Sequence, residues 1–225
     1  MKIVFDASTL ISVSQTCLVK ILAGLKRKMN ADFIVPESVF LEAVQRPIEI
    51  RRFELNAIRI KKVIEENGFR VLPAGDQSLV DEIEAIANSC FLAQGRPIRL
   101  LQRGEIEALA IAKETGADAL AIDERTTRML IENAEQLREI MQERRKIRIG
   151  IDTGKQRAFA AMFSGLAIVR SVELIALADE YGLLEDELPK GKQSLEAALF
   201  AAKYSGCAVS SREINLFLHG SGNGR

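Results

Sequence analysis

The chain has 225 residues, 48% of them hydrophobic, and its 31 basic and 31 acidic side chains give a formal net charge of zero. This length suits one well-buried domain with an elaboration, or two small ones, and the composition excludes a disordered chain. The charge balance excludes a histone-like protein and a polybasic membrane tether, so any contact with nucleic acid must come from a local patch.

Three cysteines, Cys17, Cys90 and Cys207, are widely spaced and never form a C-x-x-C pair. This pattern is typical neither of a disulfide framework nor of a structural zinc site, so we expect buried, apolar thiols. The amino terminus lacks the apolar stretch of a signal peptide, and no apolar run approaches the roughly 18 residues of a membrane span. We therefore expect a cytoplasmic protein that makes no membrane contact.

Short apolar runs rich in β-forming residues alternate with segments of helical spacing along the first 130 residues. The predicted strands are residues 2–5, 32–35, 69–72 and 118–122, and the predicted helices include 77–92, 104–115 and one that begins near Arg125. Buried strands that alternate with helices favour a right-handed, doubly wound α/β fold with a parallel sheet.

Residues 132–164 break this alternation. Their first part, IENAEQLREIMQERRK, is charged on most helical faces, and we expect a protruding, charged helical insertion or a linker here. The alternation then resumes with a predicted strand at 166–169 and predicted helices at 171–181, 194–204 and 210–218. Residues 220–225, GSGNGR, are expected to be a disordered tail.

Two predicted buried strands each end in an acid. The first runs into Asp6, and the strand at 118–122 runs into Asp123 and Glu124. Ligands of open α/β sheets bind beyond the carboxyl ends of the strands, where strand order reverses, so these carboxylates are expected to be neighbours. The alternative is that Asp6 and Asp123 only cap the helices that follow them, which is a common position for Asp.

Further acids make capping alone a poor explanation. On the predicted helix at 104–115, Glu105 falls on an apolar face of small side chains, whereas Glu107 falls beside Glu114 on the polar side and is expected to be solvated. A carboxylate on a packed face needs a partner, and a cation is the natural one. Glu42 follows the second strand, where it could reach the strand ends or lie at the surface.

Carboxylates that converge on one point repel one another and raise their pKa values unless a divalent cation neutralises them. All-oxygen ligation selects Mg²⁺, Mn²⁺ or Ca²⁺ over zinc. Such ions hydrolyse phosphodiesters by lowering the pKa of bound water and by stabilising charge on the attacking and leaving oxygens. Because His219 is the only histidine, a Ser-His-Asp or Cys-His nucleophile is not expected.

Four motifs resemble, in order and spacing, the acidic motifs of the PIN domain family. They are Asp6-Ala7-Ser8, Val35-Pro36 followed by Glu42, Gly104-Glu105-Ile106-Glu107-Ala108-Leu109-Ala110, and Ile122-Asp123-Glu124-Arg125. The later stretch VRSVELIALADEYGLL, with two helices after it, resembles the closing segment of a PIN subgroup of toxin-related, VapC-like and archaeal ribonucleases. The resemblance implies a PIN core at 1–131, completed by 165–219, with a three-layer α/β/α sandwich around a mainly parallel sheet.

The resemblance also implies an endoribonuclease that uses Mg²⁺ or Mn²⁺ to cleave single-stranded RNA. Asp6, Glu42, Glu105 and one acid of the Asp123-Glu124 pair would hold the metal and carry the chemistry, with Ser8 supporting them by hydrogen bonds. The family often has Thr-x-Asp at the last motif, and this chain departs from it, so both acids of the pair stay candidates. The implied partners are single-stranded or structured RNA, a second copy in a homodimer, and an antitoxin if the chain is a toxin.

Basic residues after the last motif are open to two interpretations. Arg125 and Arg128 could position a phosphate at the start of a helix, where backbone amides favour anions, or they could be solvated or salt-bridged. The run RRKIR at 144–148 could belong to an RNA track or form a solvated face. The alternative function is a non-catalytic PIN module that binds RNA or a protein through residues 132–148.

Overall fold

The structure, a computed structural model, describes residues 1–220 and contains a main sheet of five parallel strands in the order β3-β2-β1-β6-β8. These strands are β1 Lys2–Phe5, β2 Asp32–Pro36, β3 Arg70–Leu72, β6 Ala119–Ala121 and β8 Ala167–Val169. The chain adds β2 and β3 on one side of β1 and then returns to add β6 and β8 on the other. Strand order therefore reverses between β1 and β6.

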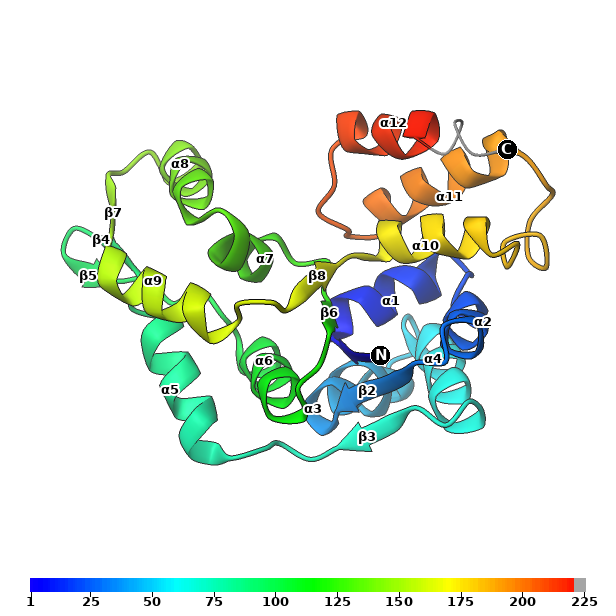
Figure 1. The fold of residues 1–225 in the computed structure, drawn as a ribbon, viewed down its shortest axis with the longest axis horizontal. Coiled ribbons are helices and arrows are strands. Elements are labelled where there is room, and N and C mark those ends of the chain that lie inside the picture. Colours follow the sequence, from blue (N-terminus) through cyan, green and yellow to red (C-terminus); the bar gives the residue numbers. More distant parts are fainter. Residues whose placement is uncertain (221–225) are drawn as a thin grey trace.

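Successive side chains of the main sheet face opposite sides, as the pleat of a strand requires. Phe5 and Phe33 face one core, which is covered by α1 Ala7–Gln15, α2 Lys20–Lys28, α4 Glu54–Glu66, α10 Ser171–Glu180 and α11 Lys192–Tyr204. Val4, Ile34 and Leu120 face a second core, which is covered chiefly by α5 Gln77–Ala87 and α6 Arg103–Thr115. The helices on the two faces give the expected three-layer α/β/α sandwich (Figure 1).

A second, antiparallel sheet of three strands lies beside the main one. Its central strand β4, Phe91–Ala93, pairs with β5, Arg96–Pro97, and with β7, Ile149–Ile151. The predicted helix at 77–92 is therefore wrong at its end, because α5 stops at Ala87, residues 88–90 form a turn and strand β4 begins at Phe91. Sequence periodicity could not separate a short apolar strand from the end of a helix here.

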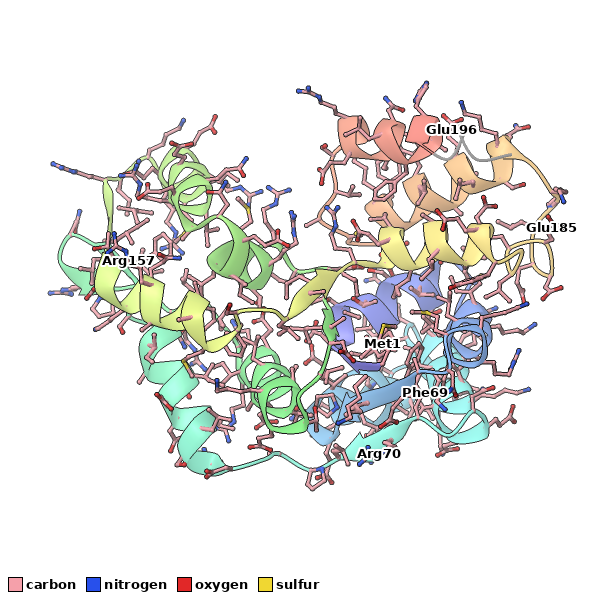
Figure 2. All side chains as sticks on the ribbon, in the orientation of Figure 1. Met1, Phe69, Arg70, Arg157, Glu185 and Glu196 are labelled. Carbon is pink, nitrogen blue, oxygen red and sulfur yellow. The ribbon has the colours of Figure 1, made fainter. Side chains whose placement is uncertain are left out.

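Residues 132–164, expected as a charged insertion or linker, are packed against this small sheet. They contain the end of α7 Arg125–Glu132, then α8 Ala134–Arg145, β7 and α9 Thr153–Met162. Leu137, Phe159 and Phe163 are buried in the same core as Phe91. The small sheet and its helices lie to the left in Figure 1, and Arg157 on α9 and Glu185 beyond α10 lie toward opposite ends of the longest axis (Figure 2).

The remaining elements are short or carboxy-terminal. They are α3 Glu37–Phe40, a π-helical turn Leu41–Gln45, a 3-10 turn Pro47–Glu49 and α12 Ser211–Gly220. Strand β8 forms the edge of the main sheet, and α10 to α12 pack in the first core, so residues 167–220 are continuous with the sandwich. The predicted tail lies outside the described residues, apart from Gly220 at the end of α12.

The three cysteines differ in their surroundings. Cys90 and Cys207 are buried, but Cys17 is exposed, so the expectation of three buried thiols is wrong for Cys17. It follows α1 in a left-handed conformation with φ of 63°, which turns the chain at the surface. Arg59 Nη1 donates a hydrogen bond of 3.3 Å to the Cys17 sulfur.

No single helix within residues 1–220 is long and apolar enough to cross a membrane. The helices α1 and α2 satisfy the length and composition criteria only when taken together, and they are bent by 117° at the break between them.

Candidate active site

The carboxyl ends of β1 and β6 meet at the point where strand order reverses, and an acid follows each strand. The Asp6 N–H donates a hydrogen bond of 2.9 Å to the Ala121 carbonyl oxygen, which holds the two strand ends together. Asp6 is only 5% exposed and Asp123 only 1%, whereas Glu124 is half-buried. The fold therefore places these three acids at the position where α/β sheets bind their ligands.

Asp6 is fixed by Ser8 at the start of α1. Asp6 Oδ2 accepts hydrogen bonds from the Ser8 N–H at 2.9 Å and from the Ser8 hydroxyl at 2.5 Å. The Ser8 oxygen in turn accepts a bond of 3.0 Å from the Asp123 N–H. Burial raises the pKa of Asp6 to about 6, with a smaller contribution from the charge of Glu42, against the lowering effect of the Ser8 bonds.

Glu105 lies in the first turn of α6 and is 9% exposed. Its Oε1 accepts a hydrogen bond of 2.5 Å from the Thr127 hydroxyl, and its Oε2 accepts one of 2.7 Å from the Gln102 N–H. Burial, with smaller contributions from the charges of Asp6 and Glu124, raises the pKa of Glu105 to about 7, against the lowering effect of the Thr127 and Gln102 hydrogen bonds. Three carboxylates from three separate segments are thus close enough to interact electrostatically.

Glu42 reaches the same region from the π-helical turn after β2, and its side chain is exposed. A β-carbon placed on Gly104 would lie 3.3 Å from Glu42 Oε2, so this carboxylate lies against the first turn of α6, beside Glu105. Short π-helical turns occur often at functional sites. The absence of a side chain at Gly104 leaves room for the Glu42 carboxylate.

Asp123 and Glu124, adjacent in sequence, point to different surroundings. Asp123 Oδ1 accepts from the Ser171 N–H at 2.7 Å and Oδ2 from the Ser171 hydroxyl at 2.8 Å, and Thr9 Oγ1 lies 3.5 Å from Oδ1. Glu124 is the residue that caps α7, where it accepts from the backbone N–H groups of Thr126 and Thr127. The capping role considered for Asp123 therefore belongs to Glu124.

Glu107 does not lie where the helical wheel placed it. It is only 7% exposed, and its Oε1 accepts a hydrogen bond of 2.6 Å from Arg103 Nε, so the expectation of a solvated side chain is wrong. The reason is that α5 packs beside α6 at this point, and Gln77 at the start of α5 accepts a bond of 2.9 Å from Arg103 Nη2. A tertiary neighbour thus covers a helix face that looks polar in sequence.

The two candidate phosphate ligands differ in their freedom. Arg128 Nη1 lies 3.3 Å from Glu132 Oε2, and the Arg128 side chain is 19% exposed, as expected for a salt-bridged arginine. Arg125 is the first residue of α7 and is half-buried beside Glu124. It lines an open cleft of about 350 Å³, which also borders Asp123 and Glu124.

The sequence analysis did not identify the hydroxyl and amide donors that fix these acids. They are Thr9, Gln102, Thr127 and Ser171. Thr127 had a local signal, because it follows the last acidic motif within one helical turn. Ser171 had none, because its contact with Asp123 joins segments that are far apart along the chain.

The oxygen donors of these acids are compatible with a divalent cation, but their side chains do not converge on one point. Within residues 1–220, no three His, Cys, Asp or Glu side chains converge tightly enough to hold a metal ion. Yet the acids supply only oxygen ligands, which suit Mg²⁺ and Mn²⁺. Burial and neighbouring negative charge hold the pKa values of Asp6 and Glu105 well above their ordinary range, which a cation would reverse.

A comparison with family models supports this geometry. A model described as a PIN domain matches residues 2–138, which is more than half of the chain and includes all the acids described above. No curated protein and no solved structure matches the chain. PIN domains are generally nucleases that use divalent metal ions. The order of the strands, the acids at their carboxyl ends and the matching family model together show that this chain belongs to the PIN domain family.

Proposed function

We propose that the chain is a metal-dependent endoribonuclease that hydrolyses single-stranded RNA with Mg²⁺ or Mn²⁺. The observation that carries the proposal is the electrostatic coupling of Asp6, Glu105 and Glu124 at the switch point of the sheet, where burial raises the pKa of Asp6 to about 6 and that of Glu105 to about 7. Such buried, mutually repelling carboxylates are typical of functional sites, where a cation stabilises their charged forms.

Asp6, Glu105 and Glu124 would hold the ion, and the exposed Glu42, which lies against the first turn of α6, would complete the set. A divalent cation supplies charge neutralisation at the phosphodiester and activates water for attack on phosphorus. Ser8 and Thr127 hold Asp6 and Glu105 in fixed orientations by hydrogen bonds of 2.5 Å each. Such prior orientation is what a hydrolytic site requires, because it leaves less reorganisation for the reaction.

Of the two acids kept open by the sequence, we propose Glu124 as the ligand. Both acids accept hydrogen bonds on both oxygens, Asp123 from Ser171 and Glu124 from Thr126 and Thr127. They differ in burial, because Asp123 is only 1% exposed and its side chain is directed to the interior, whereas Glu124 is half-buried and its charge acts on Glu105. The Asp123 carboxylate would then connect the end of β6 to Ser171 at the start of α10, while its backbone N–H donates a hydrogen bond to the Ser8 oxygen. Asp123 is therefore a positioning residue in this proposal.

A second candidate function is a PIN module that binds RNA or a protein without cleaving it. One observation favours it: within the described residues, no three His, Cys, Asp or Glu side chains converge on a position where they could hold a metal ion. The toxin role, the antitoxin partner, the homodimer and the cytoplasmic location remain predictions from the sequence. Neighbouring genes would separate a toxin from a processing enzyme, since a toxin is expected beside a small antitoxin gene.

Cleavage of a labelled, mixed-sequence single-stranded RNA tests the proposal. We expect the wild type to cut it with Mn²⁺ but not with EDTA, and Asp6→Asn to lower the rate by at least about 100-fold. The matched control is Asp32→Asn, which removes a carboxylate that pairs with Arg70 near the start of β2, at the other end of the sheet. RNA binding without cleavage would favour the binding module, and equal cleavage by Asp6→Asn would place the chemistry elsewhere.

A further inference from the structure

A cleft of about 350 Å³ adjoins the proposed metal site. One wall consists of the start of α7 and one face of α8, and the other consists of Gly206, Cys207 and Ala208 in the connection between α11 and α12. Figure 1 shows α7 and α8 on one side of the carboxyl end of β6 and this connection on the other. The volume lies near the lower end of the range for small-ligand sites, about 300 to 1,000 Å³.

The second wall is held in place by the main sandwich. The Ala208 N–H donates a hydrogen bond of 3.1 Å to the Asp123 carbonyl oxygen, and Arg170 Nη1 donates one of 3.0 Å to the Ala208 carbonyl oxygen. Arg170 is itself buried and paired with Glu173 and Glu213. The cleft is thus built into the fold, with both walls connected to the strand end that carries Glu124.

The cleft is lined by two carboxylates, Asp123 and Glu124, at the proposed metal site and by two arginines beyond them, and the arginines suit an anion. Arg125 and Arg144 both line it, and neither forms an ion pair within the described part of the chain. Two nearby arginines that do not line it are paired: Arg128 with Glu132 at 3.3 Å and Arg138 with Glu135 at 3.0 Å. The structure therefore leaves two guanidinium groups available at the cleft, where they could contact phosphate.

The same wall also presents an apolar surface. Leu137, Ile140, Met141 and Arg144 are spaced at i, i+3, i+4 and i+7, which places them on one face of α8. Leu137 is buried, and Ile140 and Met141 are half-buried. Apolar contact beside unpaired cations matches two of the three parts of a nucleotide, the flat base and the anionic phosphate.

We propose that this cleft binds one nucleotide of single-stranded RNA next to the scissile phosphate. Arg125 and Arg144 contact its phosphate, and its unpaired base packs on Ile140 and Met141. Single strands suit such a cleft because their bases can leave the stack and be taken up individually. The inference rests on the proposed function, because that function places the scissile phosphate of the RNA at the carboxylates. The binding contacts themselves involve residues that are not among the proposed metal ligands.

Equilibrium binding of a fluorescent single-stranded RNA, measured by anisotropy in EDTA so that no cleavage occurs, tests the phosphate contact. We expect Arg144→Ala to raise Kd at least about fivefold and to reduce the slope of log Kd against log salt by about 0.7, the value for one lost phosphate contact. The control is Arg145→Ala, which removes the same charge from the next position of α8 outside the cleft, and it should change Kd less than twofold.

An RNA with one abasic nucleotide, moved stepwise along the strand, tests the base contact. We expect wild-type affinity to fall at one position of the abasic residue, and Met141→Ala to lose most of that dependence. Equal effects of Arg144→Ala and Arg145→Ala, or an abasic series without any positional effect, would overturn the inference. If the cleft inference fails in this way but the protein still cleaves RNA, the proposed function is retained. If RNA binding follows the prediction but no cleavage occurs, the cleft inference is retained and the proposed nuclease function fails.

Discussion

The Thr127 hydroxyl donates a hydrogen bond of 2.5 Å to Glu105 Oε1, and both residues are buried. This bond stabilises the charged carboxylate and lowers its pKa against the larger effect of burial. Thr127→Val keeps the shape of the side chain but removes the donor. We expect it to destabilise the fold by about 1 to 2 kcal/mol and to weaken Mn²⁺ binding about tenfold, since a hydrogen bond to a charged group is lost.

Thr115→Val is the matched control for this variant. Thr115 lies at the other end of α6, and within residues 1–220 its hydroxyl bonds only to the Ile111 carbonyl oxygen of the same helix. Chemical denaturation and calorimetric Mn²⁺ titration of both variants check the prediction. Equal Mn²⁺ affinity of Thr127→Val and wild type would show that the Thr127 contact does not support the site.

The pH dependence of stability follows from the raised pKa values of Asp6, about 6, and Glu105, about 7. The unfolded chain has carboxyl pKa values near 4, so between about pH 4 and pH 7 the folded state binds more protons than the unfolded state. The free energy of unfolding of the metal-free protein should therefore fall as pH rises through this window. Asp6→Asn and Glu105→Gln should each flatten that decline.

Thermal unfolding in EDTA at several pH values measures this effect. We expect the wild-type Tm to be several degrees lower at pH 8 than at pH 5, and addition of Mn²⁺ at pH 8 to recover the loss. A wild-type Tm that rises across this range, with both variants following it in parallel, would mean that these two carboxyl groups are not held protonated by the fold.

Substitution of each acid of the adjacent pair separates a ligand from a positioning residue. Glu124→Gln should weaken Mn²⁺ binding about 10- to 100-fold, by analogy with the loss of contacts around a metal. Asp123→Asn should instead lower the free energy of unfolding by about 1 to 3 kcal/mol, because the nitrogen of the new amide cannot accept one of the two Ser171 hydrogen bonds. Its Mn²⁺ affinity, measured below its Tm, should change less than about threefold. The reverse pattern would identify Asp123 as the ligand.

Thiol accessibility tests the surroundings of the three cysteines. Cys17 is exposed, whereas burial raises the pKa values of Cys90 and Cys207 to about 11 and about 12. We expect one thiol per chain to react rapidly with a maleimide under native conditions and three to react after denaturation. Mass spectrometry of Cys17→Ser, which should show no rapid labelling, provides the control. Rapid native labelling of Cys207 would indicate that the connection between α11 and α12 opens.

The sequence predicted the sandwich because each main strand carries a local signal. Buried β-forming residues mark β1 and β2, and the acids after β1 and β6 indicate where the strand order reverses. The small sheet was missed because β4 and β7 each have only three residues and pair across a long separation along the chain. Short strands of this kind become recognisable only through their partners.

The sequence predicted that these acids lie near the strand ends but not their contacts, and their role in binding metal stays a prediction. Glu105 stood out because a carboxylate on a face of small apolar residues needs a partner. Glu107 was expected to be solvated because a helical wheel of α6 does not show that α5 packs against this face. Asp123 and Glu124 could not be separated because Ser171, which binds only Asp123, belongs to a distant helix.

Calorimetric titration of Mn²⁺ into the wild type and Asp6→Asn at pH 7.5 tests the central claim that these carboxylates form a divalent-cation site. The account predicts saturable binding of one or two ions per chain to the wild type and at least about tenfold weaker binding to Asp6→Asn. Absence of saturable binding to the folded wild type, or equal affinity of the two proteins, would contradict it.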